Sequence, residues 1–316
     1  MRSFLASPSG LHFVALFLVA IPCVNAQRKP LMRHFVAPSE EHYQVALTLR
    51  AESHSVTTET VAAQTYVTPV IHSSEATVRW RATRRVLSAE KDGSAEIEEM
   101  VEPLSGSCAE SAPTSEKIDA ALQASLREFC AFWSKRETLR YNENQRGLLH
   151  EAVVTPSTLA PLGEDPPQLL ALWLRRAARP NVIFPELSFE VGAKSKQSFH
   201  PAGNLLKNAQ GTQTAEWLDS ESDPPGATLH TVQQLVWNSS VPLSDPTSTA
   251  GQSPQVDESF FADSLTAVTP EDGSVRRANR TASRTAARRV DPVPGLPQPP
   301  DFSSKLTLSV TIERLP

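Results

Sequence analysis

A row of arginines near the carboxyl end is the part of this sequence best suited to do chemistry. Six arginines lie within VRRANRTASRTAARRV, residues 275–290, and Arg276, Arg280, Arg284 and Arg288 recur at every fourth position. Guanidinium groups form strong, charge-assisted hydrogen bonds with phosphates and carboxylates. The row could therefore bind an anion such as a phosphate, a lipid headgroup or an acidic envelope polymer. The alternative is a solvated sheet face whose arginines pair with glutamates.

The period of four fits one face of a helix or of a strand, so it does not decide the structure of residues 275–290. Thr281, Ser283 and Thr285, with an Asp-Gly turn before them, favour a strand. No aromatic residue is interleaved with the arginines, which argues against binding of single-stranded nucleic acid. The net charge of −5 gives no wider electrostatic reason to expect nucleic acid.

Two cysteines that follow the amino-terminal segment, Cys108 and Cys130, predict a disulfide. In an oxidising compartment a lone pair of cysteines usually forms a bridge. This bridge would close a loop of about 20 residues and stabilise the fold by roughly 3 kcal/mol. A cysteine nucleophile is the alternative, but it needs a histidine partner and an exposed thiolate, which nothing near either cysteine indicates.

Motifs for metal or cofactor chemistry are missing from the sequence. There is no HExxH or CxxC, no nucleophile elbow, no phosphate loop and no dinucleotide fingerprint. We therefore expect no metal and no cofactor. Carboxylates distant in the sequence could still meet in the fold as a hydrolase site. Whether the protein is an enzyme is uncertain at this point, and the sequence leans against it.

Residues 1–26 have the features of a cleaved export signal. A basic residue precedes an apolar run of about a dozen residues, which is too short to span a bilayer. Small residues predict cleavage between Ala26 and Gln27, which gives a periplasmic or secreted protein. A lipoprotein attached through Cys23 is the alternative, although Pro22 fits poorly beside such a cut. No later run is long enough for a transmembrane helix.

Strict alternation of apolar and polar residues predicts antiparallel strands with one solvated face. The clearest are HYQVALTLR, ATVRWRATRRV, SAEIEEMVE and KLTLSVTIERL, at residues 42–50, 76–86, 94–102 and 305–315. Turns carrying Asp-Gly predict two hairpins, at residues 92–93 and 272–273. Another hairpin is expected to turn near 142–147. In TLHTVQQLVWN, Leu229, Leu235 and Trp237 form the apolar set, with Thr231 and Gln233 as polar residues between them.

Two stretches predict helices packed on the sheet. Apolar residues recur at intervals of three and four between Ser115 and Lys135, and prolines bracket a second helix over 166–179. The expected fold is α+β: a predominantly antiparallel, curved, half-barrel-like sheet with two or so packed helices. Four aromatic residues are candidates to line an apolar pocket on its concave side, although core packing is their more ordinary role: Trp80, Phe129, Trp133 and Trp237.

The organisation expected along the chain is a lead-in over 27–41 and one β-rich domain over 42–316, with two subdomains split near 136–165 as an alternative. Residues 239–258 are rich in Ser, Pro and Thr and predict a flexible loop. Residues 290–301 carry five prolines and predict an extended connector.

Several motifs together resemble an uncharacterised group of exported bacterial proteins. They are VRWRATRRV followed by an acidic strand, TQTAEWLD, FFADSL before a glycine-containing turn, and VPGLPQPPDF. The resemblance covers most of the chain after the export signal and implies no functional residue, because that group has no assigned activity. The order of elements is also similar to that of periplasmic lipoprotein carriers, by fold analogy alone.

These observations favour an exported cell-envelope binding or carrier module without catalytic activity. Its partner would be a lipid, an envelope polymer or a protein. The alternatives are an assembly factor that uses an arginine-rich sheet face, and a hydrolase with a non-contiguous carboxylate site. The sequence does not identify the ligand or the oligomeric state.

Intact mass of the exported protein tests the processing and the disulfide together. We expect the mass of a chain that begins at Gln27, and an increase of about two mass units on reduction, one hydrogen for each sulfur released. A diacylglyceryl adduct on Cys23, or a mass that reduction leaves unchanged, would contradict these expectations.

Overall fold

The computed structural model describes most of the chain after the amino-terminal segment. The described residues are 30–61, 64–110, 127, 129–153, 177–199, 210–220, 226–240, 255–289 and 302–316. The predicted export signal with Cys23, Ala26 and Gln27 lies outside them, as do the proline-rich connector and residues 241–254 of the predicted loop.

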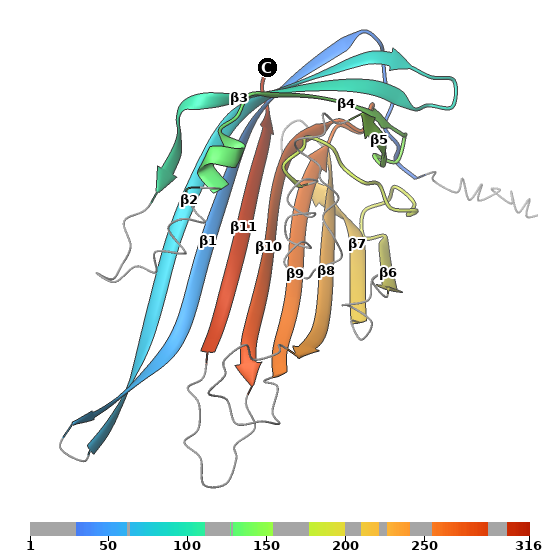
Figure 1. The fold of residues 1–316 in the computed structure, drawn as a ribbon. Helices are drawn as coiled ribbons and strands as arrows, with labels where there is room; N and C mark the ends of the chain where they lie inside the picture. Colours follow the sequence, from blue (N-terminus) through green and yellow to red (C-terminus); the bar gives the residue numbers. More distant parts are fainter. Residues whose placement is uncertain are drawn as a thin grey trace, which may run out of the picture.

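Eleven antiparallel strands form a single sheet (Figure 1). They are β1 (Ser39–Val61), β2 (Gln64–Ala89), β3 (Ala95–Glu110), β4 (Glu137–Glu143), β5 (Leu149–Val153), β6 (Lys194–Phe199), β7 (Gln210–Ser220), β8 (Gly226–Ser240), β9 (Gln255–Val268), β10 (Val275–Arg289) and β11 (Phe302–Arg314). Their order across the sheet is β5-β4-β3-β2-β1-β11-β10-β9-β8-β7-β6. Strands on both sides of residues 136–165 therefore belong to the same sheet.

Two meanders make up this sheet, and the first and last strands join them at its centre. Strands β1 to β5 pair successively in one direction, and β6 to β11 do so in the other. β1 pairs with β11 over a long register from Tyr43 opposite Arg314 to Ser55 opposite Phe302. Beyond this point β1 and β2 continue as a two-stranded arm that reaches away from the other strands (Figure 1).

The predicted hairpins are confirmed, because their turns have the local chemistry that they need. β2 and β3 turn at Gly93, and β9 and β10 turn at Gly273, both with a positive φ that suits glycine. β4 and β5 turn at Gly147 in the same way. Residues 275–289 form a strand, as the Thr and Ser residues favoured.

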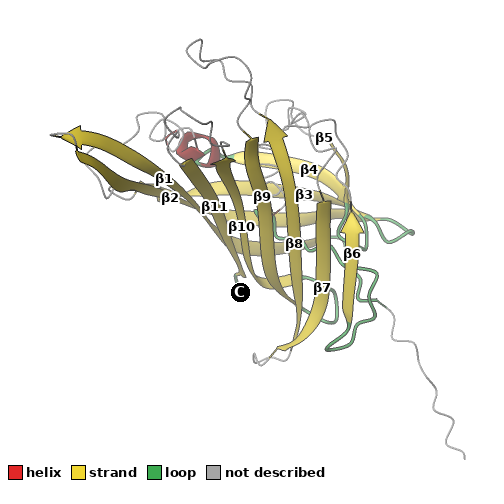
Figure 2. Ribbon diagram, turned by 90° about the horizontal axis from the view of Figure 1, so that it is seen from below, coloured by secondary structure: helices red, strands yellow, loops and turns green. Residues whose placement is uncertain are grey.

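The sheet is strongly curved, and its concave side forms the core (Figure 2). Alternate residues of each strand face inward, so that Tyr43, Val45 and Leu47 on β1 meet Val310 and Ile312 on β11 with almost no exposed surface. A short helical segment that ends at residue 133 packs on this face. Burial of apolar surface on one side of a single sheet is therefore the main source of stability.

The expected α+β class is wrong: the protein is nearly all β. In the described part of the chain no helix reaches seven residues. Of the stretch between Ser115 and Lys135, the described helical residues are 127 and 129–133, and the helix must end there because the chain turns into β4 at Glu137. Of the second predicted helix, the described residues include only its end, where residue 177 is helical. No helix among the described residues meets the length and hydropathy needed to cross a membrane.

A segment without regular structure, residues 177–193, spans the open side of the curved sheet, and we call it the strap. At one end Phe184 N–H donates to the Arg146 carbonyl in the β4–β5 turn, at 2.9 Å. At the other end Gly192 N–H donates to the Trp217 carbonyl of β7, at 2.7 Å. The strap thus links the meander of β1 to β5 with the meander of β6 to β11 across the concave side.

A buried network of charged side chains lies at one end of the concave side. Glu41 accepts two hydrogen bonds from Arg33, at 2.7 and 2.8 Å, one from Tyr43 at 2.9 Å and one from Arg84 at 3.2 Å. Arg84 also pairs with Glu143. All of these residues are at least nine-tenths buried. Burial alone would raise the pKa of Glu41, but the charges of Arg33 and Arg84 and the hydrogen bonds outweigh it and hold that pKa below its ordinary value.

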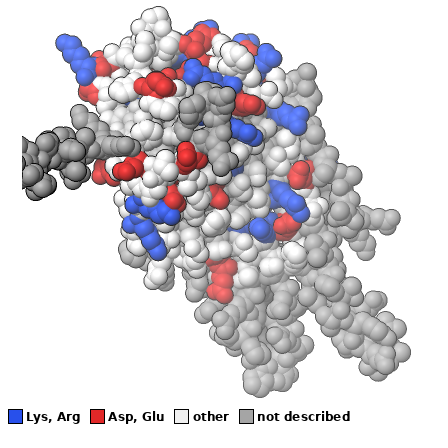
Figure 3. Space-filling view, turned by 180° about the vertical axis from the view of Figure 1, so that it is seen from behind, with Lys and Arg blue, Asp and Glu red and all other residues white. Residues whose placement is uncertain are grey.

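The other side of the sheet is polar and carries charges of both signs. Arg85 lies opposite Glu98 and Arg81 opposite Glu102 in the β2–β3 register, so arginines face glutamates across that hairpin. In Figure 3, which shows the molecule from behind, acidic and basic side chains are interspersed over the face. Among the described residues seen in this view, no large field of a single sign marks an electrostatic docking surface.

Glu41→Gln should lower the free energy of unfolding by about 3 kcal/mol at neutral pH, because it leaves buried arginine charge without its partner. The matched variant Glu40→Gln removes an exposed partner of Arg85 on the neighbouring residue and should leave the denaturation midpoint nearly unchanged. Urea denaturation of both variants measures the difference.

The same pair of variants has a pH signature. Because folding lowers the pKa of Glu41, its stabilisation is complete above the ordinary glutamate pKa and is lost as pH falls through the folded value. The difference in free energy of unfolding between wild type and Glu41→Gln should therefore become smaller below about pH 4. Equal destabilisation at both positions, or a gap that does not change with pH, would contradict the role given to Glu41.

Candidate functional site

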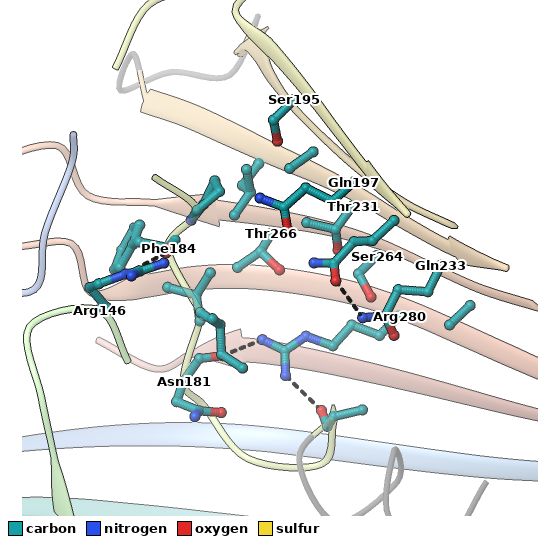
Figure 4. A pocket seen from close by; sticks show the side chains of 18 of the residues that line it. Arg146, Asn181, Phe184, Ser195, Gln197, Thr231, Gln233, Ser264, Thr266 and Arg280 are labelled. Atoms are coloured by element: carbon teal, nitrogen blue, oxygen red, sulfur yellow. Dashed lines mark hydrogen bonds between the residues drawn. The ribbon is translucent and has the colours of Figure 1, made fainter. Parts of the chain in front are cut away.

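A cavity of about 670 Å³ lies between the strap and the concave face of β6 to β10 (Figure 4). This volume is in the range of sites that hold small organic molecules. Its floor comes from five adjacent strands, so the register of the sheet fixes the spacing of its lining side chains.

A row of hydroxyl-bearing residues crosses the cavity floor. Ser195 lies opposite Ala215, which lies opposite Thr231, which lies opposite Ser264, and Ser264 lies opposite Arg280. Neighbouring strands are about 4.8 Å apart, so the side chains follow one another at about that spacing. We call Ser195, Thr231 and Ser264 the hydroxyl row. Within the described chain none of their hydroxyls is bonded to another side chain, so they can serve a ligand.

A second polar row runs beside the first, two residues along each strand. Gln197, Gln213 and Gln233 lie opposite one another on β6, β7 and β8. Gln233 Nε2 donates to Gln213 Oε1 at 3.2 Å, which orients both amides. We call these three residues the glutamine row. Together the two rows offer donors and acceptors that carry no net charge.

Apolar side chains border the two polar rows on either side. Leu229 lies on one side, and Leu235 and Phe260 lie opposite each other on the other. The strap contributes Val182 and Phe184. The cavity is therefore amphipathic: a polar band lies between apolar borders.

Arg280 is the one buried cation of the described cavity lining, and it also holds the strap. Its Nη1 donates to the carbonyls of Ala177 at 2.8 Å and Arg179 at 3.0 Å, and its Nη2 donates to the carbonyl of Asn181. Its exposed fraction is 7%. Desolvation lowers the pKa of Arg280 to about 10, so the side chain stays charged at neutral pH.

The cavity rim carries the other charged residues of the lining. Arg146 lies in the β4–β5 turn and pairs with Glu186 of the strap. Glu186 is the single carboxylate of the described lining, and its side chain is 76% exposed. The buried carboxylates of Glu41, Glu99 and Glu143 do not line the cavity. Among the described residues, no three acidic, histidine or cysteine side chains are grouped to hold a metal ion.

The predicted arginine row lies partly inside the molecule. Arg280 and Arg284 face the concave side, and Arg284 pairs with the buried carboxylate of Glu258. Arg276 is half-buried, and the Arg288 side chain is outside the described ones. The strand thus brings Arg280 to the cavity, while no observation tests anion binding by the row as a whole.

Of the four aromatic residues predicted for a pocket, Trp80, Phe129 and Trp133 are not part of the lining of this cavity. Trp80 is buried and stacks on Trp133, with ring centroids 5.5 Å apart. Both border a much smaller hollow of about 60 Å³ beside the helical segment. Phe129 packs on the core, and the side chain of Trp237 lies outside the described ones.

The predicted disulfide stays a prediction. Cys130 is buried within the core on the helical segment. Cys108 lies in β3, opposite Val78, and its side chain lies outside those described.

The residues that form the cavity were missed because polar residues were assigned to the solvated face. Thr231 and Gln233 have the same phase as Leu229 and Leu235, so alternation alone places all four on the concave side. A polar residue that alternates in step with the buried apolar residues of its strand was the sign in the sequence of a polar group on the concave side. The same signal marks Glu41, Arg84 and Glu99, which are polar but share the phase of buried neighbours on their strands.

Comparisons with known proteins add no name to this site. No protein-family model matches the chain, and no match to a curated protein was found. The resemblance to an uncharacterised exported group therefore stays a prediction, and the function must be argued from the cavity itself.

A pair of glycine variants tests whether the strap is held against the β4–β5 turn. A Cβ on Gly147 would lie 1.8 Å from the Val182 carbonyl oxygen, whereas a Cβ on Gly192 would meet nothing within 4 Å. Both glycines have a positive φ, so alanine costs each position about 1 kcal/mol of backbone energy. Gly147→Ala should lower the free energy of unfolding at least about twice as much as Gly192→Ala does. The added Cβ at position 147 also forces the Val182 carbonyl of the strap to move.

Hydrogen exchange gives the local measurement for this pair. The Phe184 amide should lose protection in Gly147→Ala and keep it in Gly192→Ala, because its acceptor lies in the displaced turn. Equal protection of Phe184 in the two variants would show that the strap does not depend on this contact.

Proposed function

We propose that this protein is a binding or carrier module that takes a small amphipathic molecule into the cavity beneath the strap. The observation that carries the proposal is the composition of the concave face of β6 to β9. There, the hydroxyl row and the glutamine row lie between apolar borders. The hydroxyls bond no other side chain of the described chain, and neither row contains an acidic residue. The side chains of the two rows are half-buried, apart from the exposed Gln197, so their polar groups are within reach of a bound molecule. A ligand with a polar and an apolar side could bond these groups and cover the apolar borders.

Binding fits the cavity better than hydrolysis does. General acid-base catalysis needs titratable groups within hydrogen-bond reach of the reacting atoms. The described lining has one carboxylate, at the exposed rim, whereas the buried carboxylates have arginine or tyrosine partners elsewhere. An assembly role through an arginine-rich face is also less well supported, because Arg280 and Arg284 point to the concave side and have partners there.

The predicted export signal is consistent with a role in the cell envelope or outside the cell. A curved sheet that encloses a mixed polar and apolar cavity suits transport or sequestration of a compound that is poorly soluble in water. The ligand would replace water against Leu229, Leu235 and Phe260 while its polar groups bond the two rows.

A neutral amphiphile tests the proposal directly. N-octanoylglycinamide should bind with a Kd of about 0.1–1 mM, as expected for a ligand of this size. Thr231→Phe places a ring in the cavity and should weaken binding at least about tenfold. Ligand-observed NMR titration of the folded protein provides the measurement.

Thr228→Phe is the matched control. Thr228 and Thr231 are both half-buried and lie on β8, but Thr228 faces the opposite side of the sheet. The control should keep the affinity of the wild type within about twofold, since its ring stays outside the cavity. The proposal fails if the wild type shows no saturable binding, or if both variants weaken it equally.

A further inference from the structure

We infer that the ligand of this cavity carries a carboxylate or similar acidic group, and that Arg280 receives it at the end of the hydroxyl row. This inference rests on the proposed function and specifies the chemical class of its ligand: a small organic acid with amide or hydroxyl groups and an apolar part. The reasoning starts from the position of Arg280, then its unused hydrogen-bond donors, then the charge balance around it.

The sheet places Arg280 in line with the neutral polar groups. It lies opposite Ser264, which lies opposite Thr231, so the three occupy successive strands on the same face. All three line the cavity (Figure 4). An acid bound at Arg280 would therefore extend over Ser264 and Thr231 if its own hydrogen-bonding groups follow at intervals of about 4.8 Å.

Some N–H groups of the Arg280 guanidinium bond no acceptor in the described chain. An arginine side chain has five N–H groups, and three hydrogen bonds from Arg280 go to strap carbonyls. Within the described residues, Nε–H and the second hydrogen of Nη2 have no acceptor. Nε and one Nη form an edge of the guanidinium that suits bidentate binding of a carboxylate.

The charge of Arg280 is not balanced by an acidic residue. No ion pair of Arg280 occurs in the described part of the chain. Buried charges are normally paired with an opposite charge, and here carbonyl dipoles provide the only compensation. Two other buried arginines, Arg33 and Arg84, both bond glutamates. Arg179 is also buried without an ion pair in the described chain, but its guanidinium lies over the Tyr141 ring and it does not line the cavity. Of these four arginines, Arg280 is the one that lines the cavity.

The remainder of the lining decides against other anion sites. Arg146 is the second cation of the lining, but it lies at the rim and already pairs with Glu186. A ligand anion there would compete with an existing carboxylate and remain in contact with solvent. The interior position of Arg280 thus provides stronger and less screened attraction.

Two ligands that differ only in charge test the inference on the unmodified protein. N-octanoylglycine carries a carboxylate, and N-octanoylglycinamide replaces it with a neutral amide. The acid should bind at least about tenfold more tightly at pH 7, which is typical of a hydrogen bond to a charged group. The preference should persist in 0.5 M salt at about the same size, because a buried pair is only weakly screened.

Variants locate the group responsible. Arg280→Gln should reduce the preference for the acid to within about twofold, and Arg280→Lys should retain part of it. Arg146→Gln removes the rim cation and should leave the preference intact. Thermal denaturation identifies any variant whose strap has been lost, and the wild-type comparison of the two ligands does not depend on the variants.

Each result decides the inference. Equal affinity of wild type for acid and amide overturns it while leaving the proposed binding function standing. A preference that Arg146→Gln abolishes, or that high salt removes, also overturns it, because the anion then binds at the rim. Absence of binding by both ligands overturns the proposed function and this inference together.

Discussion

A single curved antiparallel sheet gives this protein only one interior, and everything else in the structure follows from that constraint. Each strand turns alternate residues to the concave side, where each residue must be apolar, paired, or in contact with solvent or a bound molecule. Apolar residues of β1, β2 and β11 meet the requirement by packing on one another. The polar residues of the same side meet it in two different ways.

At one end of the concave side the polar groups satisfy one another. Glu41 accepts hydrogen bonds from Arg33, Tyr43 and Arg84, and this buried network holds the lead-in against the sheet. Beneath the strap the polar groups are arranged differently. The hydroxyl and glutamine rows point into open volume and include one mutual hydrogen bond, between Gln213 and Gln233. We regard the first as structural, since its charged groups are buried and paired with one another, and we propose that the second is functional, since its polar groups face open volume.

Local features of the sequence predicted most of the strands and their hairpins. Alternation marks β1, β2 and β11, and the glycine turns join β2 to β3 and β9 to β10. The helices were overestimated because spacing of apolar residues over 115–135 carries no information about where the chain must turn into β4. The cavity was missed since Thr231 and Gln233 were assigned by polarity instead of phase. Which strands become neighbours across the centre depends on contacts between distant parts of the chain, which periodicity does not encode.

The central pairing of β1 with β11 has a consequence for how the protein reaches its native state. Tyr43 is synthesised long before its partner Arg314, because all the other strands lie between them in the sequence. The meander of β1 to β5 can assemble first, but one edge of β1 then has no partner until β11 has been synthesised. Insertion of the final strand between β1 and β10 is thus the step that completes the sheet. A chain truncated by a dozen residues would lose its centre instead of a dispensable tail.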